Sequence, residues 1–189
     1  MFDESYINTA ARKGWIEVVV GSMFSGKTEE LIRRLKRATL AGQKVKIFKH
    51  ALDTRYSQNE VVSHDDKSLD SIPVSSAREI IAHISGINVI GIDEGQFFGQ
   101  ELTEVCNFLA NSGVRVIVAG LDMDYQGKPF GSIPGLMAVA EYVSKLHAIC
   151  VRCGNLANYS HRKINVDDLV LLGELDEYEP LCRDCYFSL

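Results

Sequence analysis

The order of apolar and polar positions along the chain predicts short buried strands that alternate with helices. Several runs of β-branched or apolar residues have the length and composition of strands buried on both faces. Strands of this kind, separated by helices, are typical of a parallel sheet covered on both sides, so the predicted fold class is α/β. The predicted strands cover residues 16–20, 45–48, 88–92, 114–119 and 145–149.

Helical periodicity fills the segments between these strands. Leu31, Leu35 and Ala38 recur at helical spacing, and Gly42 marks the end of that helix. The polar residues 50–70 are expected to form a long surface loop. The basic positions of the first helix are interpreted as a solvated face: Arg33, Arg34, Lys36 and Arg37. The predicted helices cover residues 27–41, 76–84, 99–111 and 134–143.

The first predicted strand leads into a glycine-rich turn that matches a phosphate-binding loop. Residues 21–28, GSMFSGKT, fit the pattern G-x-x-x-x-G-K-[ST] at every fixed position. The glycines let backbone N–H groups turn toward phosphate oxygens, Lys27 neutralises the β- and γ-phosphates, and Thr28 offers a hydroxyl to Mg²⁺. The helix that begins there adds the positive end of its dipole. The sequence therefore predicts a nucleotide site.

Two adjacent acids end the third predicted strand, in the stretch VIGIDEGQFF. Asp93 is placed to position Mg²⁺ beside the phosphates, and the alternative is a strand-end cap. Glu94 lies near the phosphates, where it either orients a water in an ATPase or accepts a proton from a substrate hydroxyl in a kinase. Arg55, in the stretch DTRY, either stabilises charge on a transferring phosphoryl group or forms a structural salt bridge.

Four of the five cysteines form two Cys-x-x-Cys pairs near the end of the chain. In a reducing compartment such pairs indicate metal ligands, and four thiolates suffice for a closed, structural zinc site. Disulfides and a redox dithiol are the alternatives. Cys106 lies on an apolar helix face and is expected in the core. The predicted zinc ligands are Cys150, Cys153, Cys182 and Cys185.

The segment between the two cysteine pairs differs from the rest of the chain. Residues 154–181 contain only a short apolar run, at 169–172, so we expect a small separate lobe that the metal holds at its base. Such a lobe could close over a substrate and exclude water. The expected domains are a phosphate-loop core over residues 1–149 and a zinc-binding domain over residues 150–189.

Composition excludes several classes of protein. The chain has 189 residues, of which 46% are hydrophobic and 24% charged, and its net charge is -5. A protein that grips long nucleic acid usually has a basic footprint, so no nucleic acid polymer is expected as a partner. No stretch approaches the ~20 apolar residues of a membrane helix. Because the N-terminal residues lack the apolar core of a signal peptide, the expected location is the cytoplasm.

Together these motifs resemble the zinc-containing (type II) thymidine kinase family. From about residue 15 to 187, the stretches GSMFSGKT, DTRY, DEGQFF, GLDMDYQGKPFG, CVRC and YEPLCRDCYF occur in the family's order. The resemblance implies a RecA-like α/β core with a zinc-anchored lasso that encloses the base. It also implies ATP-dependent phosphorylation of the 5′-hydroxyl of thymidine, and of deoxyuridine, in nucleotide salvage and DNA precursor synthesis.

The resemblance also assigns roles to individual residues. It implies that Glu94 is the catalytic base, with Arg55 as a second catalytic residue. The implied ATP and Mg²⁺ site consists of Gly21, Ser22, Met23, Phe24, Ser25, Gly26, Lys27, Thr28, Asp53, Asp93, Glu94, Gly95 and Gln96. The implied thymidine site consists of Met23, Phe97, Leu121, Tyr125, Ser160, Leu171, Leu172, Gly173, Glu174, Leu175 and Tyr178. Phe98 is expected to pack behind Phe97.

The family is typically homotetrameric and is inhibited by thymidine triphosphate, so both properties are expected here. Tyr125 departs from the family pattern, because many members have Phe at that position. A hydroxyl there needs a partner or water and could alter the fit around the base. The competing hypothesis from another class is a phosphate-loop ATPase with a zinc ribbon that acts on nucleic acid or on a protein.

Overall fold

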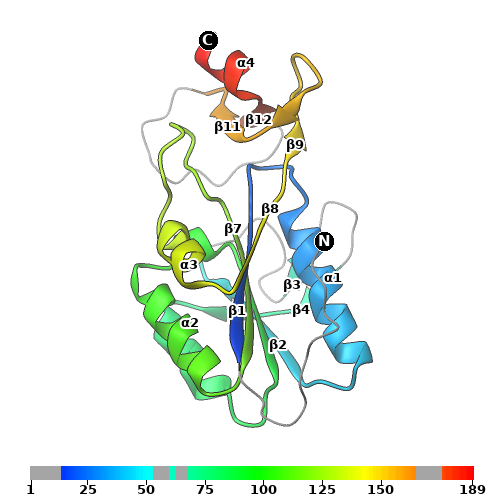
Figure 1. The fold of residues 1–189 in the computed structure, drawn as a ribbon, viewed down its shortest axis with the longest axis vertical. Helices are drawn as coiled ribbons and strands as arrows, with labels where there is room; N and C mark the ends of the chain where they lie inside the picture. The colour runs from blue at the N-terminus through cyan, green and yellow to red at the C-terminus, as the bar shows by residue number, and fades with distance from the viewer. Residues whose placement is uncertain (1–13, 53–59, 63–67, 165–175) are drawn as a thin grey trace.

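The centre of the molecule is a sheet of six parallel strands (Figure 1). The computed structural model describes residues 14–52, 60–62, 68–164 and 176–189. The strand order β5-β2-β6-β7-β1-β8 places β7 between the strand that precedes the phosphate loop and the strand that ends in the two acids. The predicted α/β class with a RecA-like parallel sheet is confirmed. The strands are β1 (Trp15–Val20), β2 (Val45–His50), β5 (Ile72–Val74), β6 (Val89–Asp93), β7 (Arg115–Gly120) and β8 (Tyr142–Lys145).

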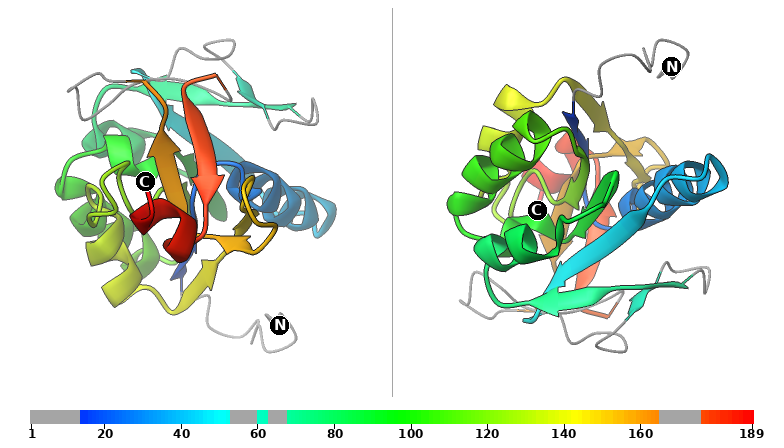
Figure 2. Two further views of the ribbon diagram at one scale, coloured as in Figure 1. Left: turned by 90° about the horizontal axis from the view of Figure 1, so that it is seen from above. Right: turned by 90° about the horizontal axis from the view of Figure 1, so that it is seen from below.

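Helices cover both faces of this sheet (Figure 2). Helix α1 (Lys27–Leu40) buries Leu31, Ile32, Leu35 and Ala38 against one face. The other face is covered by α2 (Glu101–Asn111), α3 (Ile133–Val139) and the 3-10 segment η2 (Ala77–His83). Because β6 and β7 are buried along their whole length, side chains from both faces form the core.

The prediction that the basic residues of α1 form a solvated face is wrong for Arg34. Its side chain is 3% exposed, and its Nη1 lies 2.8 Å from an oxygen of the fully buried Glu17. Arg115 contacts the other oxygen of Glu17 at 2.6 Å. A buried carboxylate needs compensating charge, and Glu17 on β1 faces α1, so one arginine of that helix turns inward. Arg33, Lys36 and Arg37 are exposed, as predicted.

Several predicted boundaries are also corrected. The predicted loop at 50–70 contains a pair of antiparallel strands, β3 (Glu60–Val62) and β4 (Ser68–Asp70). The predicted helix at 134–143 ends at Val139, because Ala140 is extended and the next residues form the edge strand β8 beside β1. The predicted helix at 76–84 is the 3-10 segment η2.

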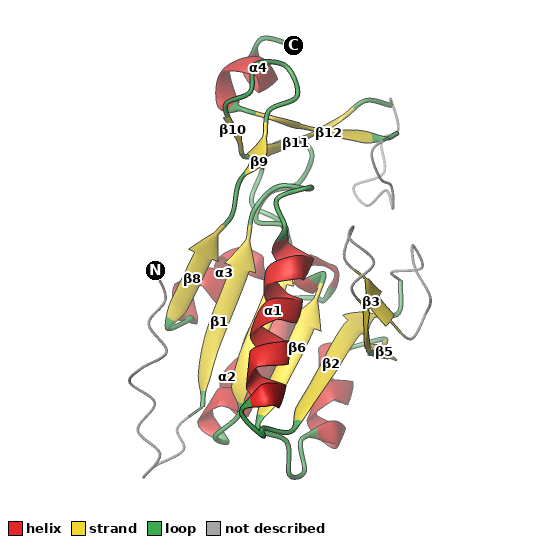
Figure 3. Ribbon diagram, turned by 90° about the vertical axis from the view of Figure 1, so that its right-hand side faces the viewer, coloured by secondary structure: helices red, strands yellow, loops and turns green. Residues whose placement is uncertain are grey.

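A small lobe stands at the end of the sheet to which the strands point (Figure 3). Residues 148–164 and 176–189, here called the cysteine lobe, contain two short antiparallel strand pairs and one helix. These elements are β9 (Ala148–Ile149), β10 (Leu156–Ala157), β11 (Tyr159–Arg162), β12 (Tyr178–Leu181) and α4 (Arg183–Phe187). Among the helices of the described ranges, none is long and apolar enough to cross a membrane.

Candidate active site and metal centre

The phosphate loop connects β1 to α1 and owes its shape to two glycines. Gly21 has φ +148° and Gly26 has φ +83°, a range that favours glycine. A Cβ on Gly21 would lie 2.3 Å from the Leu146 carbonyl oxygen. The Ser25 hydroxyl donates to the Ser22 carbonyl at 2.8 Å and closes the turn. The N–H groups of the first turn of α1, which have no acceptor inside the helix, therefore form an anion-binding end.

Three polar side chains gather around this loop. The Lys27 ammonium donates to the Ser22 carbonyl at 2.7 Å, so it lies against the loop that would hold the phosphates. The Thr28 hydroxyl lies 3.2 and 3.4 Å from the two carboxylate oxygens of Asp93. Asp93 is 7% exposed and ends β6, two strands away from β1. This pair brings together a hydroxyl and a carboxylate, the hard oxygen ligands that suit Mg²⁺.

The second acid differs from the first in backbone conformation and in hydrogen-bond partners. Glu94 has φ +51° and ψ +45°, a left-handed conformation that is uncommon for a residue with a side chain. Its N–H donates to an Asp93 carboxylate oxygen at 3.0 Å. The two neighbouring carboxylates thus have different partners, since Asp93 contacts α1 and Glu94 accepts a hydrogen bond from the Gln96 amide. Backbone strain of this kind is concentrated at functional sites.

Gln96 links Glu94 to the next strand. It lies in η3 (Gly95–Phe97) and is 4% exposed. Its amide nitrogen donates to Glu94, while its carbonyl oxygen accepts from the Leu121 N–H at 3.0 Å. The Ser132 hydroxyl donates to the Gly95 carbonyl at 3.1 Å and holds the same segment from α3. The orientation of Glu94 is therefore supported by groups that directly follow β7 and directly precede α3.

The two phenylalanines after the acids have different environments. Phe98 is 2% exposed and packs in the main core, with its ring 4.8 Å from that of His50. The prediction that Phe98 is a packing residue is confirmed by its burial in the core, and its position behind Phe97 stays a prediction. Phe97 is only half-buried at the end of η3.

The loop of residues 121–130, between β7 and α3, rises toward the cysteine lobe (Figure 1). Its two arms are joined by a bridge between Met123 and Pro129. The Asp124 carboxylate accepts hydrogen bonds from two backbone N–H groups across the tip, each at 2.9 Å. Gly127 makes the turn with φ +74°. Tyr125 is thereby held at the tip of a hairpin, half-buried.

The phosphate loop contacts the cysteine lobe directly. The Met23 N–H donates to the Ser160 hydroxyl at 3.0 Å, and the Ser22 hydroxyl donates to the Ala157 carbonyl at 3.3 Å. Phe24 packs against the small apolar cluster of the lobe. The phosphate loop and the strands of the cysteine lobe are therefore in direct contact.

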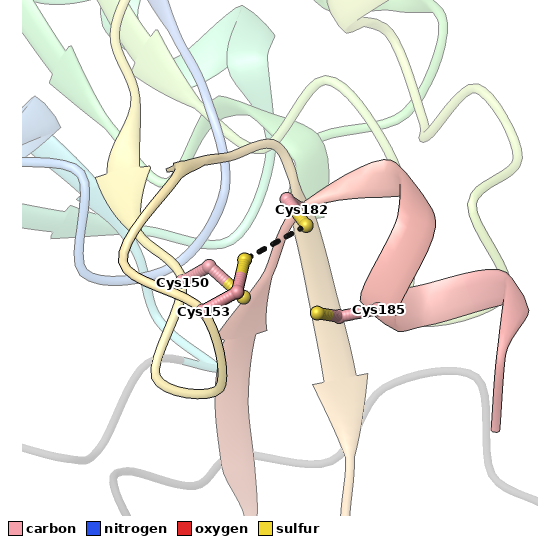
Figure 4. A group of neighbouring side chains, drawn as sticks. All are labelled: Cys150, Cys153, Cys182 and Cys185. Atoms are coloured by element: carbon pink, nitrogen blue, oxygen red, sulfur yellow. Dashed lines mark hydrogen bonds between the residues drawn. The ribbon is translucent and has the colours of Figure 1, made fainter.

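The four paired cysteines converge from two parts of the lobe (Figure 4). All four sulfur atoms lie within 4.8 Å of one another, and those of Cys153 and Cys182 are 3.5 Å apart. Cys150 and Cys153 lie in the turn between β9 and β10, whereas Cys182 and Cys185 flank the start of α4. None of the four is joined in a disulfide. The arrangement is compatible with a tetrahedral metal site that has no open position.

The protonation chemistry of the cluster fits a bound cation. Burial raises the pKa of the Cys150 thiol, but hydrogen bonds from backbone N–H groups outweigh it and bring that pKa to about 6. Hydrogen bonds to Cys153 and Cys182 raise the pKa of Cys185 to about 12. The Cys150 thiol therefore loses its proton more readily than the Cys185 thiol, whose neighbours Cys153 and Cys182 favour the protonated form and whose ionisation the charge of Cys150 also opposes. A divalent cation removes that conflict. Cys106 lies fully buried in the main core, as predicted, and burial raises its pKa.

Arg162 is a residue near the site that sequence reasoning missed. It lies on β11 and is 7% exposed. Its guanidinium stacks on the ring of Tyr125 and donates to the hydroxyl of Tyr178, two residues that had been predicted to contact substrate. Basic side chains are usually solvated, and nothing in the stretch around this arginine distinguishes it from a surface position.

Some of the predicted site residues lie outside the described residues. Of the predicted phosphate-side residues, these are Asp53 and Arg55. Of the predicted thymidine-side residues, they are Leu171, Leu172, Gly173, Glu174 and Leu175.

Comparison with known proteins agrees with this geometry. A sequence profile described as "Thymidine kinase" matches residues 14–186. A thymidine kinase of Bacteroides fragilis strain YCH46 is 60% identical over 186 residues, which cover 98% of this chain and 94% of the relative. One of Porphyromonas gingivalis strain ATCC 33277 is 56% identical, with 93% and 86% covered. One of Bdellovibrio bacteriovorus is 53% identical, with 97% and 89% covered. The chain belongs to the thymidine kinase family.

Proposed function

We propose that this protein is a thymidine kinase that transfers the γ-phosphate of ATP to the 5′-hydroxyl of thymidine, and of deoxyuridine. The product is the nucleoside monophosphate, which supplies DNA precursors by salvage. Beyond family membership, the observation that carries the proposal is the Thr28–Asp93 hydrogen bond beside the differently oriented Glu94. Thr28 and Asp93 offer oxygen ligands for Mg²⁺ near the phosphate loop, and Glu94 offers a second carboxylate. This combination suits phosphoryl transfer to a hydroxyl.

On the phosphate side, the loop residues 21–28 would cradle ATP, with Lys27 against the β- and γ-phosphates. Asp53, Gly95 and Gln96 would complete this side. Mg²⁺ would be held by Thr28 and Asp93 and would supply neutralising charge to the phosphates. Arg55 would stabilise the transferring group, although it lies outside the described residues. The positions of Lys27, Thr28 and Asp93 around one loop support these roles.

Glu94 would act as the general base. Its carboxylate would accept the proton of the 5′-hydroxyl as that oxygen attacks the γ-phosphorus and the bond to the β-phosphate oxygen breaks. Support comes from the hydrogen bond that Gln96 donates to Glu94, since this bond holds the carboxylate in one orientation. Asp93 is hydrogen-bonded to Thr28, so its proposed role is at the metal and not as the general base.

The thymidine would lie between the phosphate loop and the cysteine lobe. Its described contacts would be Met23, Phe97, Leu121, Tyr125, Ser160 and Tyr178, and the segment from Leu171 to Leu175 would close over the base. Support comes from two hydrogen bonds that link these residues to one another and to the proposed base. Met23 bonds to Ser160, and Leu121 bonds to the glutamine that holds Glu94.

The domain division follows from this arrangement. Residues 1–149 would form the ATP-binding core and residues 150–189 the lasso, with Zn²⁺ on the four cysteines as a structural ion. Closure of the lasso over the nucleoside would exclude the water that competes for the phosphate. Homotetramer formation, inhibition by thymidine triphosphate and location in the cytoplasm complete the proposal by analogy with the family.

A panel of separate nucleosides with MgATP tests this function. The expected result is thymidine 5′-monophosphate in quantity, deoxyuridine monophosphate as a second product, and no conversion of purine nucleosides. Product identity is read by chromatography against 5′- and 3′-monophosphate standards. Hydrolysis of ATP without phosphorylation of any nucleoside would contradict the proposal and favour an ATPase.

A further inference from the structure

Arg162 joins three segments that are far apart in the sequence. Its guanidinium carbon lies 3.7 Å from the ring centroid of Tyr125, at the tip of the 121–130 loop of the core. Its Nε and Nη2 donate to the Tyr178 hydroxyl at 3.1 and 2.8 Å. Arg162 on β11 and Tyr178 on β12 are direct cross-strand partners. One side chain therefore contacts the core loop with its face and the opposite strand with its edge.

Arginine is suited to this double contact in a way that lysine is not. The guanidinium is planar, so its face can stack on an aromatic ring while its N–H groups donate in the plane. An ammonium group is a compact, strongly hydrated charge without that plane. Because Arg162 is 7% exposed, its charge must be compensated by the groups around it, which makes its position well defined.

The tip of the 121–130 loop has a second attachment to the cysteine lobe. The Tyr186 hydroxyl donates to the Tyr125 carbonyl at 2.7 Å, and its ring stacks on Tyr159 at 4.5 Å between centroids. Tyr186 follows the metal-cluster residue Cys185 directly. The backbone and the ring of Tyr125 are thus both held from the lobe.

The other end of the same loop leads to the proposed catalytic base. Leu121 begins the loop, and its N–H is bonded to Gln96, which donates to Glu94. A displacement of the loop tip would move residues that the proposed function places around the nucleoside. The phosphate loop joins β1 to α1, and its hydrogen bonds to the lobe go to Ser160 and Ala157 rather than to Arg162, so we expect it to keep its shape.

We propose that Arg162 is a positioning residue for the nucleoside, because it fixes Tyr125 of the core and Tyr178 of the lobe as one continuous wall of the thymidine site. The inference rests on the proposed function and assigns a role to a residue that does not itself react. It predicts that loss of the guanidinium raises the KM for thymidine and leaves the KM for ATP unchanged.

Arg162→Lys tests this role, with Arg152→Lys as the matched control. Arg152 lies in the same lobe, but its side chain is 43% exposed and its ion pair with Glu179 is a surface contact. In Arg162→Lys the thymidine KM is expected to rise about tenfold or more, as for loss of charge-assisted hydrogen bonds, with the KM for ATP unchanged. Arg152→Lys should leave both values at those of the wild type.

Hydrogen–deuterium exchange supplies a readout that does not depend on turnover. In Arg162→Lys the amides of residues 121–130 should exchange faster, while those of α1 should be unchanged. If Arg162→Lys folds poorly, Tyr178→Phe removes the hydroxyl that accepts from Arg162 and should likewise speed amide exchange in residues 121–130, a readout that does not depend on any contact of Tyr178 with thymidine. An equal rise of the KM values for thymidine and ATP would show that Arg162 has a general structural role, and it would overturn the inference.

The inference and the proposed function fail in different ways. A wild-type protein that does not phosphorylate thymidine overturns the function and with it the nucleoside role of Arg162. A wild-type protein that does so, with an unchanged thymidine KM and unchanged loop exchange in Arg162→Lys, overturns the inference alone.

Discussion

The two halves of the proposed active site are stabilised in different ways. The phosphate side is formed by β1, β6 and α1, which pack through large apolar clusters on both faces of a six-stranded sheet. The nucleoside side includes the cysteine lobe, whose own cluster consists of Ala148, Cys150, Ala157, Leu181 and Cys182. Small domains bury too little surface to be stable alone, and metal sites commonly compensate.

This difference means that the two halves should respond separately to perturbation. Lys27 and Thr28 begin a helix whose apolar face is buried in the core, and Asp93 ends a fully buried strand, so we expect a single surface change to leave them in place. The nucleoside side depends on a few specific contacts: the four sulfur atoms, the Tyr186 hydroxyl and the Arg162 guanidinium. Changes in the core should therefore affect the chemical step or ATP, and changes at the lobe should affect thymidine.

The largest effect is expected at the carboxylate between the two halves. Glu94→Gln should lower kcat roughly 10²–10⁴-fold, because the amide cannot accept the hydroxyl proton. Both KM values should stay close to those of the wild type, which steady-state kinetics would measure. Glu104→Gln, on the exposed face of α2, is the control and should have no effect. Turnover near that of the wild type in Glu94→Gln would remove this residue from the mechanism.

The next largest effect concerns the phosphate side alone. Lys27→Met should lower kcat by roughly 10²–10³-fold and weaken ATP binding, because a charge that stabilises the transferring phosphoryl group is lost. Thymidine binding, measured by titration calorimetry, should not change. Lys36→Met on the exposed side of the same helix is the control. A matching loss of thymidine binding in Lys27→Met would contradict the separation of the two halves.

A smaller effect is expected where the core loop meets the lobe. In Gly127→Ala the added Cβ would lie 3.1 Å from the Tyr159 ring, at a residue with φ +74°. The substitution should destabilise the protein by about 1–3 kcal/mol in denaturant unfolding and raise the thymidine KM. Gly42→Ala is a close control, since Gly42 has φ +75° and open space around it. That variant should lose similar stability with an unchanged thymidine KM, and an equal rise in both variants would exclude the Tyr159 contact as the cause.

The smallest effect is expected from the departure from the family at Tyr125. Its hydroxyl bonds to the exposed Gln126 amide at 3.0 Å, whereas its ring stacks under Arg162. Tyr125→Phe keeps the ring and should leave the thymidine KM within roughly threefold of the wild type, as expected for one exposed hydrogen bond. Tyr125→Leu removes the ring and should raise it further. If Tyr125→Phe raised the thymidine KM more than Tyr125→Leu did in the same kinetic assay, the hydroxyl and not the ring would be the important group.

The features of the core that the sequence predicted are those with a strong local pattern. The apolar runs and the helical period predicted the parallel sheet. The glycine spacing of residues 21–28 predicted the tight turn, which requires a positive φ at Gly21 and Gly26. The cysteine spacing predicted the cluster because each Cys-x-x-Cys pair brings two sulfur atoms together within one turn. These properties depend on neighbours in the chain, so they can be read from it.

Features that depend on distant contacts were not predictable. Arg34 was expected in solvent, but Glu17 on another element draws it into the core. Arg162 acquires its role only because the 121–130 loop brings Tyr125 onto it. The left-handed backbone of Glu94 occurs at the residue that precedes η3, a segment that Ser132 holds from a distant part of the chain through the Gly95 carbonyl. Charge pairing across elements needs the tertiary fold, and no periodicity in the sequence reports it.

The most direct test of the two-part account is ligand binding by the metal-free protein. A thiol-protected sample treated with chelator would be titrated with a non-hydrolysable ATP analogue and, separately, with thymidine, before and after reloading with Zn²⁺. Circular dichroism would verify that the sheet persists. The account predicts that the nucleotide binds as in the metal-loaded protein, and that thymidine binding is lost and returns with the metal. Thymidine binding that survives removal of the metal would contradict it.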